Sequence, residues 1–173
     1  MDLTSIIPNY TLKSENLGLG SSLGLWDLLR SKIIMQTTLL IYLKQVKDKD
    51  LQKFLHKTVN KINEKQISNM QNLLTEKGYK TPKGADFEEK QKKEHRFAVS
   101  KLILSDKEIA LSLGELYRLT LSLETETLGI ATDLDSRNIL YDIFKEDNEE
   151  YAKVLKLQQE KTWTDFPPYI LPQ

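Results

Sequence analysis

The sequence contains no cysteine and only two histidines among its 173 residues. The lack of cysteine excludes disulfide frameworks, cysteine-ligated zinc, iron–sulfur clusters and thiol nucleophiles. With His56 and His95 as the only imidazoles, a serine hydrolase triad has no supported general base. A chain of this length buries a sufficient core without such groups, so we predict one domain over residues 1–173.

Long apolar runs and an excess of one charge are also absent. No run approaches the ~20 residues that a membrane-spanning helix requires, and Met1–Tyr10 has no basic region followed by an apolar stretch. The 25 basic and 25 acidic side chains cancel, which argues against a protein that binds nucleic acid through its phosphates. We therefore predict an intracellular, cytoplasmic protein without a membrane or nucleic-acid partner.

The cancelling charges are divided unevenly along the chain. Residues 1–104 carry 18 basic and 11 acidic side chains, whereas residues 105–173 carry 7 and 14. Oppositely charged halves attract each other. The division favours a first helix pair lying against a second with complementary flanks; head-to-tail association between molecules is the alternative.

Apolar residues recur at intervals of three and four in four long segments, which is the pattern of amphipathic helices. We predict helices over residues 21–47, 48–77, 105–132 and 135–162. The first two are joined by a very short link, as in an antiparallel hairpin. The predicted fold is therefore all-α: an antiparallel four-helix bundle with an irregular arm at 1–20, a long crossover at 79–104, and an extended proline-rich tail at 163–173.

The helix boundaries rest on side chains that satisfy free backbone groups at helix ends. Ser105 and Glu108 form an S-x-x-E capping box, and Gly78 provides a C-terminal stop. The remaining candidate N-caps are Ser21 or Ser22, Asp48 or Asp50, and Asp133 or Asp135.

The first helix is apolar on more than one side. We predict that its core-facing stripe begins at Trp26, so that Trp26→Ala costs ~3–5 kcal/mol if the indole is buried. The full predicted stripe is Trp26, Leu29, Ile33, Thr37, Leu40 and Leu43. The glycine-rich run at residues 18–24 lacks the preceding strand of a phosphate-binding loop, so we interpret it as a flexible approach to this helix.

A bundle with a long crossover raises the question of a ferritin-type metal site. That site needs a Glu from each of two helices and a Glu-x-x-His from each of the others, and here a lysine precedes each histidine by three residues. Glu124, Asp147 and Glu150 lie beside the inward stripes and could bind a cation together with an inward glutamine. We interpret them as exposed or edge carboxylates, and predict no catalytic, cofactor or metal residues.

The C-terminal tail places apolar area outside any helix, because its prolines disfavour helical backbone. Such a segment seals its own bundle or docks on a partner, and we favour sealing. The candidate interaction residues are Phe166, Pro167, Pro168, Tyr169, Ile170 and Leu171.

Several short motifs follow this order of elements: Leu25-Trp26, residues 76–84 (EKGYKTPKG), Ser105-Asp106, Arg137 and residues 167–172 (PPYILP). With these motifs the chain resembles a family of ferritin-like bundles from spore-forming bacteria, whose members have no established activity and commonly carry a spore coat label. Its first two helices are also similar to the coat protein F family. The resemblance implies a ferritin-like fold and a spore coat or sporulation context, and it transfers no catalytic residue.

These observations together favour a non-enzymatic structural or protein-interaction protein that acts in the spore coat or during sporulation. Its expected partners are copies of itself in a homo-oligomer, such as a dimer, or other coat proteins. The alternative is a bundle that binds a metal ion or a small hydrophobic ligand between its helices.

Overall fold

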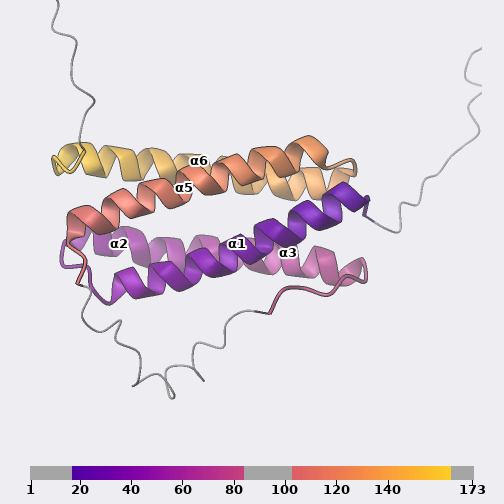
Figure 1. Ribbon diagram of the computed structural model, residues 1–173, viewed down its shortest axis with the longest axis horizontal. Helices are drawn as coiled ribbons and strands as arrows, with labels where there is room; N and C mark the ends of the chain where they lie inside the picture. The colour runs from indigo at the N-terminus through magenta and orange to yellow at the C-terminus, as the bar shows by residue number, and fades with distance from the viewer. Residues whose placement is uncertain (1–16, 84–102, 165–173) are drawn as a thin grey trace, which may run out of the picture.

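The computed structural model describes residues 17–83 and 103–164 (Figure 1). The predicted interaction tail, Phe166–Leu171, lies outside these residues, as do most of the predicted arm and most of the predicted crossover.

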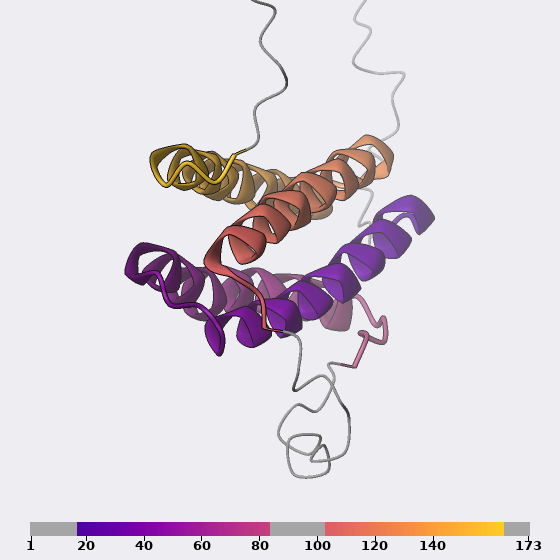
Figure 2. The same cartoon turned by 60° about the vertical axis from the view of Figure 1, so that its left-hand side comes forward.

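The described chain folds into two helical hairpins stacked on each other (Figures 1 and 2). One hairpin pairs α1 (Leu19–Leu43) with a long helical segment made of α2 (Lys49–Lys57), the π-helical η2 (Thr58–Asn63) and α3 (Glu64–Glu76). The other pairs α5 (Asp106–Ile130) with α6 (Leu134–Glu160). The α1 helix packs beside α5, and α6 lies diagonally across the bundle from α1 (Figure 2). The predicted all-α four-helix architecture is confirmed, and the described residues contain no strand.

Local capping sets most of the helix ends where the sequence places them. The Asp48 carboxylate accepts hydrogen bonds from two backbone amides at the start of α2, and Asp133 accepts one at the start of α6. Ser105 and Glu108 form the predicted capping box of α5. Gly78 has a φ of 81°, a conformation typical of a glycine after a helix. It lets the backbone amides of Gly78 and Tyr79 donate hydrogen bonds to carbonyls in the last turn of α3.

The start of α1 differs from the prediction. Its N-cap is Gly18 instead of Ser21 or Ser22, because the Ser21 hydroxyl is turned inward and accepts a hydrogen bond of 3.1 Å from the Thr132 amide. The glycine-rich run is part of the helix and allows close packing. A Cβ placed on Gly24 would lie 2.6 Å from Cγ2 of Thr127, so α1 and α5 approach more closely here than any side chain would permit.

The buried face of α1 is also rotated from the predicted one. Trp26 is only half-buried, and its indole Nε1 donates a hydrogen bond of 3.1 Å to the Lys80 carbonyl. Within the predicted stripe, Leu29 is buried, and Ile33, Leu40 and Leu43 are partly buried against the core. The most deeply buried face lies to one side of this stripe. Because α1 is apolar on most sides, periodicity alone did not single out that face. The hydrophobic residues that are buried along α1 are Leu25, Leu28, Leu29, Met35, Leu39 and Tyr42.

The bundle interior consists of two apolar clusters with a polar layer between them. One cluster lies toward α2 and contains Leu39, Leu55 and Leu113; the other lies toward α3 and contains Leu28, Met70 and Leu140. The polar layer includes Lys32, which is fully buried in the middle of α1. Within the described part of the chain, no helix is both long and apolar enough to cross a membrane.

Candidate functional site

The polar layer receives one side chain from each of the four helical segments. Lys32 comes from α1, Gln66 from α3, Glu124 from α5 and Asp147 from α6, and none of them is more than 1% exposed. Charged side chains are almost never fully buried unless they are paired. Each of these four residues therefore needs a partner within the layer.

The Lys32 ammonium group lies between two carboxylates. Its Nζ is 2.9 Å from Oε1 of Glu124 and donates a hydrogen bond to Oδ2 of Asp147. The second oxygen of Asp147 accepts a hydrogen bond of 2.9 Å from Nε2 of Gln66. Asp147 is thus held from two sides, and the layer links α1, α3, α5 and α6.

Burial determines the protonation of this layer. It raises the pKa of Glu124 to about 8; the nearby Lys32 opposes the rise, and Asp147 adds to it through charge and a shared hydrogen bond. At neutral pH Glu124 therefore keeps its proton, because burial disfavours the charged form of the carboxyl group. The contact between Lys32 and Asp147 is then the ion pair of the layer.

A second polar group extends the layer along α6. Oε1 of Glu150 accepts hydrogen bonds from Nζ of Lys57 at 2.7 Å and of Lys153 at 2.6 Å, while the carboxylate is only 5% exposed. Nearby, the Tyr117 hydroxyl lies 3.5 Å from the Thr58 hydroxyl, and burial raises the pKa of Tyr117 far above its usual range. Thr58 is the first residue of η2, and π-helical turns frequently occur at functional sites.

The arrangement parallels the ferritin-type metal site in position but not in chemistry. Each of the four helical segments sends a polar group inward. The pairs Asp147/Glu150 and Gln66/Asn69 have the spacing of a Glu-x-x-His motif, but Asn69 is exposed. However, neither pair contains a histidine, and Lys32 stands where a carboxylate ligand would be needed. The described residues include no group of three or more His, Asp or Glu side chains placed to hold a metal ion. The site therefore does not fit a di-metal centre.

The three sequence-based candidates lie inside the bundle. Glu124, Asp147 and Glu150 are all buried, so their interpretation as exposed or edge carboxylates was wrong. Lys32 was missed altogether. The only signal for it is its position among the buried apolar residues of α1, where a lysine requires a carboxylate from another helix. His56 is exposed on α2.

The charge division of the sequence is reflected in ion pairs between the two hairpins. Lysines of the first hairpin pair with carboxylates of α6, which agrees with the predicted packing of complementary flanks. These pairs are Lys32–Asp147, Lys57–Glu150, Lys65–Glu146 and Lys77–Asp135.

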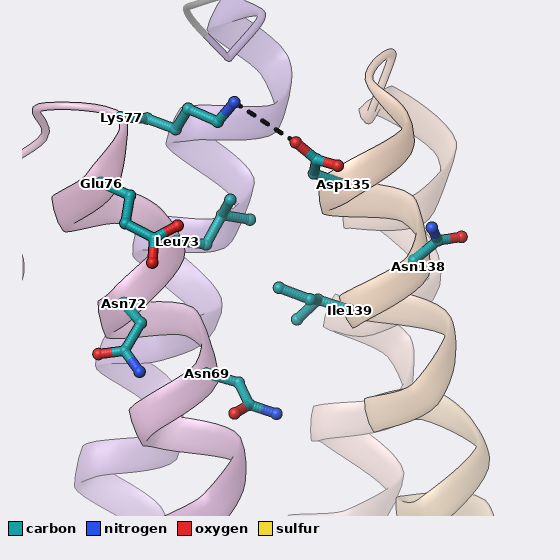
Figure 3. Close-up of a pocket in the computed structure, with 8 residues that line it drawn as sticks. All are labelled: Asn69, Asn72, Leu73, Glu76, Lys77, Asp135, Asn138 and Ile139. Atoms are coloured by element: carbon teal, nitrogen blue, oxygen red, sulfur yellow. Dashed lines mark ion pairs between the residues drawn. The ribbon is translucent and has the colours of Figure 1, made fainter.

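A shallow surface groove lies between the end of α3 and the start of α6 (Figure 3). Its floor is formed by Leu73 and Ile139, its walls carry three asparagines, and Lys77 bridges to Asp135 over 3.4 Å. The groove contains no histidine and no buried polar group aimed into it. It is polar and lies outside the core, so it does not match the predicted hydrophobic ligand site between the helices.

Comparisons with known proteins agree on the fold and leave the activity open. The family model described as "Protein of unknown function (DUF3231)" matches residues 8–173. No curated protein matches the sequence. A solved structure from Bacillus halodurans, named as a "putative spore coat protein", is similar with a TM-score of 0.77 and 17% identity, over 92% of this chain and 98% of that one.

Two further solved structures are similar in fold. The first is a two-domain protein from Anabaena variabilis with DJ-1/ThiJ/PfpI-like and ferritin-like domains, at a TM-score of 0.66 and 16% identity, over 88% of this chain and 40% of that one. The second is a conserved hypothetical protein from Mycobacterium tuberculosis. Its TM-score is 0.65 and its sequence identity is 11%, over 81% of this chain and 98% of that one. At these identities the similarity shows the ferritin-like fold alone.

Proposed function

The chain belongs to the DUF3231 family, and we propose that it is a non-enzymatic structural protein that works by association with copies of itself or with other proteins of an assembly such as the spore coat. The observation that carries this proposal is the contact of the Lys32 ammonium with both Glu124 and Asp147. Because the Lys32 ammonium lies between these two side chains, they contact an internal cation and stabilise the bundle. The central layer then specifies the packing of the helices and does no chemistry.

Two further observations support an interaction role. The described surface exposes large apolar side chains on α1, α5 and α6, and unusually apolar surface marks interaction sites. The similar Bacillus halodurans protein carries a spore coat name, which supports an assembly in a spore.

The proposal is tested by measuring metal content and association on one preparation. Tag-free full-length protein is incubated with iron(II), manganese(II) or zinc, desalted and analysed for metal, while its molar mass is followed by light scattering over a concentration series. We expect well under one equivalent of metal and a mass that rises with concentration. Lys32→Glu is the matched comparison, because it replaces the internal cation with a potential ligand.

Either of two results overturns the proposal. Stoichiometric metal in the wild-type protein supports the alternative of a ligand-binding bundle and assigns Glu124 and Asp147 to the metal. A protein that stays monomeric and joins no assembly when mixed with spore coat extract removes the interaction role.

A further inference from the structure

The solvent-facing stripe of α1 is unusually apolar. Its exposed residues between positions 19 and 41 include four large hydrophobic side chains, Leu19 (75% exposed), Leu23 (59%), Ile34 (54%) and Ile41 (38%). The outer face of a helix in a bundle is normally charged or polar. A stripe of this composition indicates a surface that another element covers.

The stripe is also narrow. At 3.6 residues per turn, the exposed positions 19, 23, 27, 30, 34 and 41 fall within an arc of about 80°. Leu23 and Ile34 lie about 16 Å apart along the axis, on either side of the charged residues Asp27 and Arg30. This is the shape of a seam between two helices.

The centre of the stripe carries one charge of each sign. Asp27 and Arg30 are both exposed, and neither forms an ion pair with any other described residue. The order of residues is self-complementary when the helix is reversed. If a second α1 lies antiparallel with its crossing point between residues 28 and 29, Asp27 faces Arg30 of the second copy, and Leu23 faces Ile34. Such mutual pairing is the property of an isologous twofold interface.

The neighbouring helix α5 widens the apolar surface. A groove between α1 and α5 is lined by Ile34, Leu116, Leu119 and Leu123, and Leu119 is 57% exposed. In the antiparallel arrangement, Leu23 of the second copy lies against Ile34 at the rim of this groove. The groove thus provides a recess for the side chain that the charge pairing brings to it.

We propose that the outer stripe of α1 is the twofold interface of a homodimer, in which two copies of α1 pack antiparallel and exchange two Asp27–Arg30 ion pairs. The inference rests on the proposed interaction function and names its first partner, a second copy of this chain. Charge complementarity selects this occupant, because the central positions Leu23, Asp27, Arg30 and Ile34 match their own reverse. An unrelated partner has no reason to carry the matching order of side chains.

The decisive experiment uses charge reversal at the two central positions of the full-length chain. Asp27→Arg places two arginines opposite each other at both contacts, and Arg30→Asp does the same with aspartates. Each variant alone should dimerise with a Kd at least about tenfold higher than that of the wild type. An equimolar mixture of the two should recover tight association, because the chain with arginine at both positions then faces the chain with aspartate at both. The double variant Asp27→Arg/Arg30→Asp should also recover it.

Analytical ultracentrifugation gives the Kd values, and native mass spectrometry distinguishes the mixed dimer from the two homodimers. The control is Asp142→Arg, the same charge reversal at an exposed position on α6, diagonally across the bundle. Circular dichroism melts check that each variant folds, and Leu23→Glu provides a second, apolar probe of the same seam.

The possible failures are distinguishable. Wild-type association that neither reversal weakens overturns the α1 interface and leaves the proposed function standing on another surface. Weakening without recovery in the mixture overturns the antiparallel pairing. A wild-type chain that is monomeric at millimolar concentration overturns the dimer, while its capture by coat proteins would still support the proposed function.

Discussion

Lys32 of α1 reaches Asp147 of α6 across the diagonal of the bundle and forms an ion pair with it that is shielded from solvent on all sides. The two residues are separated by 115 positions in the chain, and each comes from a different hairpin. Removing a charge from water is costly, so a buried pair is stable only when both partners and their remaining hydrogen bonds are in place. The stability of the bundle should therefore depend strongly on either partner.

We predict that Lys32→Met lowers the free energy of unfolding by about 3–5 kcal/mol, because it leaves the Asp147 carboxylate buried without its cation. Urea denaturation followed by circular dichroism measures the loss. Arg118→Met is the control, since the ion pair of Arg118 with Glu115 is more than half exposed and should contribute at most about 1 kcal/mol. The combined variant Lys32→Met/Glu124→Leu/Asp147→Leu should regain most of the lost stability, and an equal loss in that variant would contradict the electrostatic explanation.

The raised pKa of Glu124 should give the protein an unusual dependence of stability on pH. Its pKa is about 8 in the folded protein against an ordinary 4.5, so between these values the folded state holds a proton that the unfolded state has released. The stabilisation that comes from this proton is complete below pH 4.5 and is lost as the pH rises through 8. The free energy of unfolding falls by at most about 1.4 kcal/mol per pH unit. Urea midpoints measured between pH 5 and 9 should fall, and they should fall less in Glu124→Gln.

The control for this pH dependence is Glu115→Gln, at an exposed carboxylate on the same helix. It should leave the slope unchanged. A wild-type protein whose stability is flat between pH 5 and 9 would show that Glu124 is ionised when buried. Carboxylates whose pKa is lowered, such as Asp48, act in a separate window, because their contribution is lost only in acid.

The Asp48 cap provides a third prediction. Its carboxylate accepts hydrogen bonds from the amides of Asp50 and Leu51 at 2.9 and 3.0 Å, and it also binds Lys161. Asp48→Ala should cost about 1–2 kcal/mol, most of it from the lost cap. Asp50→Ala removes an exposed partner of Lys161 without touching the cap, and should cost about 0.5 kcal/mol or less in the same denaturation measurement.

Caps were predictable from the sequence because they are local. Asp48, the Ser105–Glu108 box and Gly78 each act within a few residues, so a short stretch of sequence contains the whole interaction. The four-helix architecture was predictable for a related reason, since the spacing of apolar residues repeats over many turns. A single misread position does not change that pattern.

The central layer could not be predicted in the same way. Nothing near Lys32 in the sequence indicates that its partners are Glu124 and Asp147, which reach it only after both hairpins have packed. Each carboxylate taken alone resembles a solvated side chain beside an apolar stripe. The π-helical segment Thr58–Asn63 was also missed, because its residue types do not differ from those of an ordinary helix. The missing Glu-x-x-His motifs were visible in the sequence, but the lysine that lies between the carboxylates could not be found there.

Gly24 and Gly129 provide the fourth prediction as a matched pair of helical glycines. An added Cβ at Gly24 would lie 2.6 Å from Cγ2 of Thr127, whereas one at Gly129 would meet nothing within 4 Å. Gly24→Ala should therefore lower stability by about 1–3 kcal/mol, because α1 and α5 must move apart. Gly129→Ala should raise it by up to about 1 kcal/mol through helix propensity alone. Thermal melts of both variants measure the difference. A stabilising Gly24→Ala would mean that the close approach of α1 to α5 is absent in solution, and that the glycines serve the helix start in some other way.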